Sequence, residues 1–166
     1  MPRRYWLFKS EPSAYSFDDL VKEGVAEWDG VRNFQARNYL KSEIQEGDGV
    51  LFYHSSLKPM AVVGTARVVR AGYPDHTAWD LTSDHPDAKS TAEKPIWYMV
   101  DIAPAERFSR LVTLEEMRRE PRFAKMILLQ RGMRLSVQPV AEEEWEVVRE
   151  LGRPVPLTFS DSSNPT

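Results

Sequence analysis

The stretch Trp28-Asp29-Gly30-Val31-Arg32-Asn33-Phe34-Gln35-Ala36-Arg37-Asn38 combines a turn with an unusual set of polar side chains. Asp29-Gly30 is a turn dipeptide, because glycine accepts a positive φ at no steric cost. Two Asn, one Gln and two Arg then follow within seven residues. Amide and guanidinium groups have fixed geometry and suit planar, polar ligands such as base edges or phosphate. The stretch therefore predicts a binding site with a short helix behind it, from Asn33 to about Ser42.

Two residues of this stretch each have two interpretations. Trp28 is either a platform on which a ligand stacks or an ordinary core residue. Asn33 is either a ligand contact or the N-cap of the helix that follows it. The polar cluster around them favours the site, with Arg32 and Arg37 as candidate contacts to phosphate.

Length and composition fit a soluble globular protein with one core. The chain has 166 residues, of which 42% are hydrophobic and 28% charged, as is usual for a single domain. We predict one domain over residues 1–152 and a flexible C-terminal tail over 153–166, because that tail lacks an apolar face. No apolar run is long enough to span a membrane, and the first residues lack a signal-peptide core, so we expect a cytoplasmic protein without a membrane partner.

Metal and thiol chemistry find no support in the sequence. The chain has no cysteine, which excludes disulfides, thiolate metal sites and cysteine nucleophiles. The three histidines, His54, His76 and His85, lack the spacing of a metal-binding motif. We therefore predict no metal and no cofactor.

The charge distribution allows two interpretations. A formal net charge of −3 argues against a protein that coats nucleic acid without specificity. Between Met117 and Arg134, however, there are six basic residues against one acidic residue, Glu120. This segment predicts either a local basic surface or helix ends that carry solvated charges.

Hydrophobic patterns and stop signals predict strands alternating with helices. A capping-box pattern at Ser16 begins a helix that Gly24 ends, and Thr113 begins another. Gly64 suggests a bulge or a close backbone approach within its strand. Residues 72–95 lack periodicity and predict a long ordered loop. The expected strands are 5–8, 49–55, 61–70, 96–102 and 134–140, and further helices are expected at 122–131 and 142–151.

Short strands interrupted by helices predict an α+β domain on a small, twisted mixed sheet or barrel. The strands 49–55 and 61–70 are expected to be antiparallel neighbours. Polar residues fall where strands end, at Lys9-Ser10, Tyr53-His54-Ser55 and Ser136 to Gln138. Because the ends of neighbouring strands converge, we expect these side chains to lie together.

Five segments of the sequence resemble the successive motifs of the EVE domain family. They are Trp6 to Pro12, Trp28 to Asn38, Leu51 to Ser55, Tyr73 to Asp80 and Leu135 to Val140. The resemblance runs from about residue 4 to 150. It implies a PUA-like fold, a small mixed β-barrel flanked by short helices, related to YTH and ASCH domains.

The function that the resemblance implies is binding of DNA or RNA through a modified base, either a modified cytosine or a methylated adenine. The sequence leaves the choice of base, the choice of nucleic acid and the oligomeric state open. Phe34 stands where the family commonly has Tyr, and Ala88 where it usually has Pro. By motif position, the implied base-binding pocket comprises Lys9, Ser10, Trp28, Asn33, Tyr53, His54, Trp79, Ser136 and Gln138.

Two other classes of protein remain as alternatives. A small hydrolase would use Ser10 or Ser55 with His54 and Asp80, but the sequence has no GxSxG elbow. A protein-interaction module would use the aromatic residues only as core. A zinc-dependent base deaminase is excluded, since it would require cysteine ligands.

Overall fold

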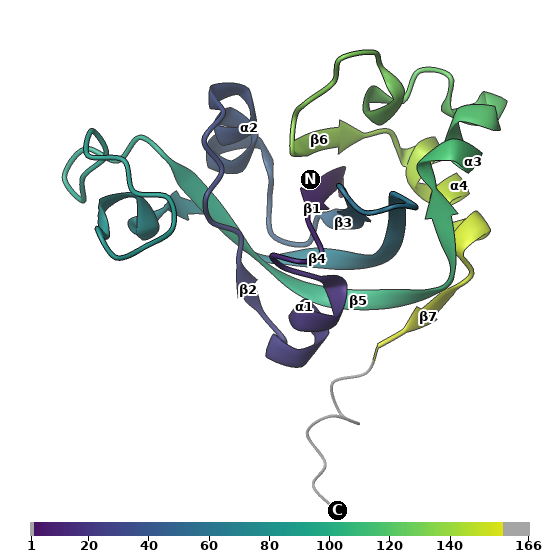
Figure 1. Cartoon of the computed structure of the whole chain (residues 1–166), viewed down its shortest axis with the longest axis horizontal. Helices are drawn as coiled ribbons and strands as arrows, with labels where there is room; N and C mark the ends of the chain where they lie inside the picture. Colours follow the sequence, from purple (N-terminus) through teal and green to yellow (C-terminus); the bar gives the residue numbers. More distant parts are fainter. Residues whose placement is uncertain (1, 158–166) are drawn as a thin grey trace, which may run out of the picture.

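The computed structural model describes residues 2–157, which form a strongly curved mixed sheet with short helices on both faces (Figure 1). The elements, in chain order, are β1 (Tyr5–Ser10), α1 (Phe17–Glu23), β2 (Ala26–Glu27), α2 (Phe34–Asn38), the π-helix η1 (Tyr39–Glu43), β3 (Gly49–His54), β4 (Ala61–Pro74), the 3-10 helix η2 (His76–Trp79), β5 (Tyr98–Thr113), α3 (Leu114–Arg119), the 3-10 helices η3 (Pro121–Phe123) and η4 (Ile127–Leu129), β6 (Val137–Val140), α4 (Glu142–Gly152) and β7 (Pro154–Pro156).

The sheet has seven strands, in the order β2-β5-β4-β3-β1-β6, and β7 pairs with β5 beyond this path. The β1–β3 pair is parallel and the others are antiparallel. The predicted α+β class and mixed sheet are confirmed. The predicted barrel differs in one respect, because within residues 2–157 no pairing joins β2 to β6 and the sheet is not closed.

Successive apolar side chains of the central strands point to opposite faces of the sheet, so the core is divided into two clusters, one on each face. The first core cluster includes Phe8 and Phe52, and the second includes Leu7 and Tyr53. This follows from the period of two in a strand, where successive side chains point to opposite faces. The helices α3 and α4 lie across β1 and β3 from α2 (Figure 1), and α4 covers the second cluster with Trp145.

The two long strands β4 and β5 extend beyond the predicted segments 61–70 and 96–102. The suggested bulge at Gly64 is confirmed, because the register with β5 shifts between Val62 and Gly64. A Cβ atom at Gly64 would lie 2.6 Å from the carbonyl oxygen of Glu106, so the backbones approach too closely for a side chain.

Local helix signals are confirmed where a polar side chain caps the first turn. The Ser16 hydroxyl accepts from Asp19 N while the Asp19 carboxylate accepts from Ser16 N, and Gly24 ends α1 at φ 83°. The hydroxyl of Thr113 caps α3 in the same way.

The predicted helix at 122–131 is wrong. Two short 3-10 helices, η3 and η4, stand in this segment in place of an α-helix. Phe123, Met126 and Leu128 all enter the second core cluster, and their spacing of three and two residues cannot place them on one face of an α-helix. Burial of these side chains therefore decides the local backbone.

The predicted tail begins too early. Pro154–Pro156 form β7 against β5, and Leu157 N donates to Ala105 O at 2.9 Å. The rest of the predicted tail lies outside the described residues. No helix within residues 2–157 has the length and apolar character needed to cross a bilayer.

Candidate functional site

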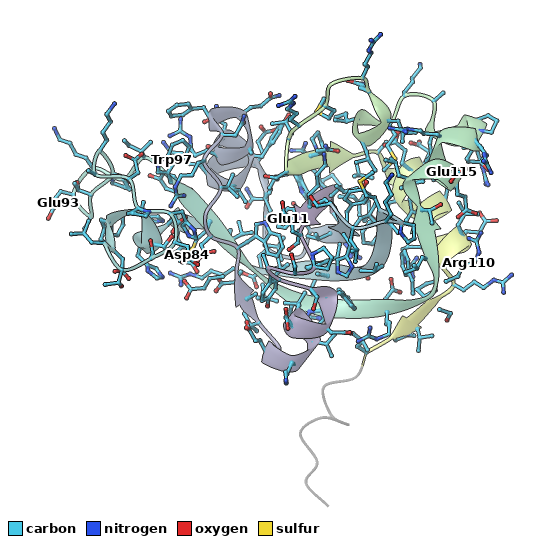
Figure 2. The ribbon with its side chains drawn as sticks, viewed as in Figure 1. Glu11, Asp84, Glu93, Trp97, Arg110 and Glu115 are labelled. Carbon is cyan, nitrogen blue, oxygen red and sulfur yellow. The ribbon has the colours of Figure 1, made fainter. Side chains whose placement is uncertain are left out.

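A cavity of about 710 Å³ opens where β1 ends and where the chain leaves β2. Glu11 and Asp84, both labelled in Figure 2, line it from segments far apart in the sequence. Its lining comprises Lys9, Ser10, Glu11, Ala14, Tyr15, Glu23, Val25, Ala26, Glu27, Trp28, Asp29, Gly30, Val31, Arg32, Asp84, His85 and Ser136.

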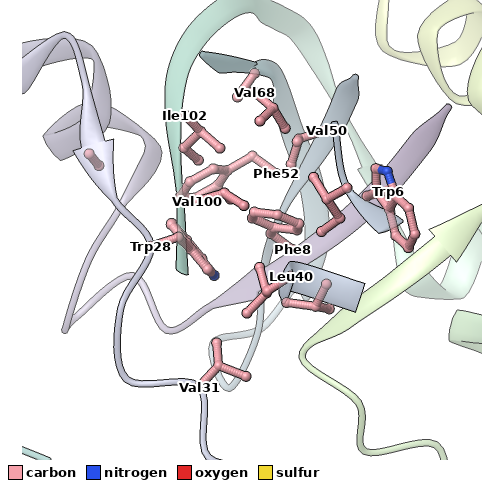
Figure 3. Packing of buried hydrophobic residues seen from close by; sticks show 14 of the residues in the cluster. Trp6, Phe8, Trp28, Val31, Leu40, Val50, Phe52, Val68, Val100 and Ile102 are labelled. Carbon is pink, nitrogen blue, oxygen red and sulfur yellow. The ribbon is translucent and has the colours of Figure 1, made fainter. Parts of the chain in front are cut away.

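Trp28 connects this cavity to the first core cluster. Its side chain is 9% exposed, and its ring centroid lies 5.3 Å from that of Phe8 and 5.6 Å from that of Phe52. Tyr15, which also lines the cavity, meets Trp28 edge-on at 6.1 Å. Figure 3 shows Trp28 beside Phe8 within the cluster. The indole is therefore a core residue that also lines the cavity.

The exit of β1 brings Lys9, Ser10 and Ser136 to the same cavity. Lys9 N donates to Ser136 O at 2.8 Å, which extends the pairing of β1 toward β6. The Ser10 hydroxyl donates to the carbonyl of Tyr15 and so ties the strand exit to the segment before α1. Burial lowers the pKa of the Lys9 ammonium.

One carboxylate holds the site loop, residues 29–32. The side chain of Asp75 is 0% exposed, and its Oδ2 accepts from Gly30 N and from Arg32 Nη1, each at 2.9 Å. Its Oδ1 accepts from Thr77 N at 2.9 Å. Burial by itself would raise the pKa of Asp75, but the hydrogen bonds from Thr77, Gly30 and Arg32 outweigh it and lower that pKa.

The turn predicted at Asp29-Gly30 is confirmed, because Gly30 has a φ of 78°. A Cβ atom there would lie 2.9 Å from the imidazole of His85, so the ring packs directly on the glycine backbone. His85 Nε2 is buried without a hydrogen-bond partner and lies 3.6 Å from Asp29 Oδ2. Burial raises the pKa of Asp29, and the charge of His85 acts against that rise.

Among the residues that the sequence assigned to the site, the structure brings five to the cavity, namely Lys9, Ser10, Trp28, Arg32 and Ser136. The guanidinium of Arg32 is already hydrogen-bonded to other residues of the protein. Its Nη1 donates to Asp75 and its Nη2 donates to the carbonyl of His85 at 2.8 Å. Arg32 therefore connects the site loop to the segments that contain Asp75 and His85.

The other residues that the sequence assigned to the site lie away from this cavity. Asn33 caps α2, with its Oδ1 accepting from Ala36 N at 3.0 Å, as the second interpretation of Asn33 proposed. Tyr53 belongs to the second core cluster, across the sheet from Trp28. His54 Nε2 accepts from Phe17 N at 3.1 Å.

Three more of the assigned residues do not line the cavity. Gln138 is 1% exposed and donates to Leu135 O at 2.8 Å. Arg37 donates to Ile96 O at 2.7 Å from its Nη1. Trp79 ends the 3-10 helix η2 and does not contribute to the lining of the cavity.

Residues that the sequence reasoning did not assign also line the cavity, among them Tyr15, Asp29 and His85. Asp29 was interpreted only as half of a turn dipeptide. Its position directly after Trp28 was the available signal, because two successive residues at a strand exit can both reach one opening. Within residues 2–157, no group of three or more potential metal ligands occurs.

A curved mixed sheet with an aromatic and polar cavity at its strand exits defines a small domain of the PUA-like type. The model of the EVE domain family matches residues 4–151. The chain belongs to the EVE domain family.

Several known proteins are similar to this chain in sequence or in fold. Mouse thymocyte nuclear protein 1 is 37% identical to this chain, over an alignment that covers 89% of this chain and 73% of that protein. The crystal structure of human THYN1 protein in complex with 5-methylcytosine containing DNA matches with a TM-score of 0.83 at 33% identity, covering 92% of this chain and 99% of that one. A protein of Pseudomonas putida matches with a TM-score of 0.85 at 45% identity, covering 89% and 98%.

Proposed function

We propose that the protein is a DNA-binding module that reads a modified base, with 5-methylcytosine as the first candidate, in the cavity at the exit of β1. The observation that carries the proposal is the shared fold with human THYN1, whose structure contains DNA with 5-methylcytosine. The cavity of this chain supplies an aromatic side chain, Trp28, and polar groups beside it.

The size and lining of the cavity are compatible with one extruded base. Its volume of about 710 Å³ lies within the range of roughly 300–1,000 Å³ for small-molecule sites. Extraction of a base from a duplex costs a few kcal/mol, and stacking on an aromatic ring returns about 1–3 kcal/mol. Stacking therefore offsets the extraction, and net affinity depends on further contacts to the base edge and the phosphates.

Recognition of the modification itself requires more than apolar burial. Burial of one added methyl group contributes about 0.8 kcal/mol, or roughly a factor of four. Hydrogen bonds to the base edge discriminate more strongly, because a mismatched buried polar group costs about 1–3 kcal/mol. A polar cavity around an aromatic ring supplies both kinds of contact.

A panel of fluorescent oligonucleotides tests the proposal. Each member carries one base at a central position: cytosine, 5-methylcytosine, adenine or N6-methyladenine, in DNA and in RNA, and affinities are measured by polarisation at two salt concentrations. We expect a preference for 5-methylcytosine in DNA whose ratio stays nearly constant as salt rises, because salt screens phosphate contacts and not the pocket. Equal affinity for all members would refute the proposal and leave a general binding module.

A matched pair of variants tests the cavity. Trp28→Leu removes the ring that lines the cavity, whereas Phe8→Leu removes a fully buried ring of the same core cluster that does not line it. We expect Trp28→Leu to weaken binding by about fivefold or more, from the stacking contribution, and Phe8→Leu to lower the melting temperature without weakening binding. Equal effects of both variants on binding would show that Trp28 acts only through the core.

The hydrolase alternative has little geometric support. The Nε2 atom of His54 already accepts a hydrogen bond from Phe17 N, and that lone pair is the one a general base would use. Asp80 accepts instead from its neighbour Thr82. Within residues 2–157, no side-chain hydrogen bond joins the Ser, His and Asp of that alternative to one another.

A further inference from the structure

A cavity that senses only a methyl group cannot identify 5-methylcytosine. Thymine carries a methyl group at the same C5 position. The two bases differ at C4, where cytosine has an amino donor and thymine a carbonyl acceptor, and at N3, which is an acceptor in cytosine and an N–H donor in thymine. A reader of 5-methylcytosine therefore needs a hydrogen-bond acceptor that faces the amino group. A carboxylate is the side chain that suits this role.

The cavity is rich in acceptors of this kind. Five of its lining residues carry a carboxylate, whereas only Lys9 and Arg32 carry a fixed positive charge, and Arg32 is paired with Asp75. Such a lining repels phosphate and favours a ligand edge with N–H donors. The phosphates of a bound strand must then lie outside the cavity while the base enters it.

Most of these carboxylates already have a partner. Glu11, Glu23 and Glu27 are hydrogen-bonded to a serine, a tyrosine and a histidine side chain, respectively. Asp84 is exposed at the rim. Among residues 2–157, no other residue donates a hydrogen bond to the carboxylate of Asp29.

The surroundings of Asp29 favour contact with a donor. It directly follows Trp28, its side chain is 40% exposed, and His85 Nε2 stays 3.6 Å from its Oδ2, which is beyond hydrogen-bonding distance. The charged groups that face it are His85, Asp75 and Glu27, and burial raises the pKa of Asp29 despite His85. A partly dehydrated carboxylate without a donor gains more from an N–H group than a hydrated one does.

We infer that Asp29 is the specificity-determining acceptor for the exocyclic amino group of the bound base, so that the cavity admits 5-methylcytosine and rejects thymine. This inference rests on the proposed function and adds the residue that reads the base edge. The two bases bury the same methyl group, so the discrimination between them belongs to their polar edge at C4 and N3, of which Asp29 reads the C4 amino group.

The variant Asp29→Asn tests this role with duplexes that differ at one position, carrying 5-methylcytosine, cytosine or thymine opposite guanine. An Asn amide has nearly the shape of the carboxylate but can turn its NH₂ group toward the thymine carbonyl. We expect the preference for 5-methylcytosine over thymine to fall by about tenfold or more. The preference for 5-methylcytosine over cytosine should persist, because both bases carry the amino group.

The control Asp84→Asn removes the same charge from the rim of the cavity. It should strengthen binding of all three duplexes by a similar factor and leave both ratios unchanged. Melting temperatures of both variants verify that they are folded.

The outcomes separate the two proposals. If the native protein prefers 5-methylcytosine over cytosine and Asp29→Asn still rejects thymine as strongly, the role of Asp29 is refuted and the proposed function stands. If the native protein binds the three duplexes equally, the proposed function fails and the role of Asp29 fails with it.

Discussion

Replacement of Asp75 by Asn tests whether one buried carboxylate holds the site loop in place. Oδ2 of Asp75 accepts from Gly30 N and Arg32 Nη1, and Oδ1 accepts from Thr77. An Asn side chain has the same shape but only one acceptor oxygen. In either orientation its NH₂ group therefore faces N–H donors that have lost their acceptor.

The expected loss follows from these contacts. Removal of one partner of a buried ion pair costs about 3–5 kcal/mol, but the side chain of Arg32 is 22% exposed, so water partly replaces the lost contact. We expect the free energy of unfolding to fall by about 2–3 kcal/mol at pH 7, toward the range of about 1.5–3 kcal/mol for a hydrogen bond to a charged group. At about 2–4 °C per kcal/mol, the melting temperature should fall by about 4–12 °C.

The control Asp80→Asn changes a carboxylate with a similar local motif. Asp80 also accepts from the backbone and hydroxyl of the threonine two residues on, Thr82, but it is exposed and does not contact the site loop. Chemical unfolding of both variants should show little change for Asp80→Asn. Binding should also weaken in Asp75→Asn, because Gly30 and Arg32 lose their anchor.

The pH dependence of the unfolding free energy gives an independent check of the role of Asp75. The folded pKa of Asp75 lies below its ordinary value of 3.8, so its contribution is present above about pH 3.8 and is lost as the pH falls through the folded pKa. The difference in unfolding free energy between native protein and Asp75→Asn should thus be complete at pH 7 and vanish in strong acid. Equal stability at pH 7, or equal losses for the two variants, would refute the reasoning.

Two further changes address the sheet. A chain ended at Arg153 should unfold at a lower urea concentration than one ended at Leu157, because it lacks β7 and the bond from Leu157 N to β5; identical midpoints would mean that β7 contributes nothing. Gly64→Ala should lower the free energy of unfolding by about 1–3 kcal/mol through overpacking, because its Cβ would lie 2.6 Å from Glu106 O; an unchanged urea midpoint would show that β4 and β5 can separate there without cost.

The sequence predicted those helices and strands that residues within the same segment specify. The helix α1 is specified by Ser16 and Gly24 at its two ends, and β1 by a run of aromatic and apolar residues. By contrast, β5 continues to Thr113 through Pro104 and several charged residues, where only pairing with β4 and β7 makes the extended backbone favourable. Tertiary pairing of this kind leaves no local pattern.

Part of the cavity lining was predictable from the sequence. Motif positions pointed to Trp28, Lys9, Ser10 and Ser136, which do line the cavity. They could not reveal that Tyr53 faces the opposite side of the sheet from Trp28, because the sequence does not show which of the alternating side chains of β3 point to which face. They also could not assign Arg32 to Asp75, since the two are brought together only by the fold.

The position of β1 has a consequence for how the protein acquires its site. This N-terminal strand lies between β3 and β6, and Lys9 is bonded to Ser136 near the other end of the chain. Pairings between such distant segments are slow to form, because a long loop must close before they contribute. During synthesis the pairing of β1 therefore stays incomplete until β6 has left the ribosome, and a partly made chain lacks the complete cavity.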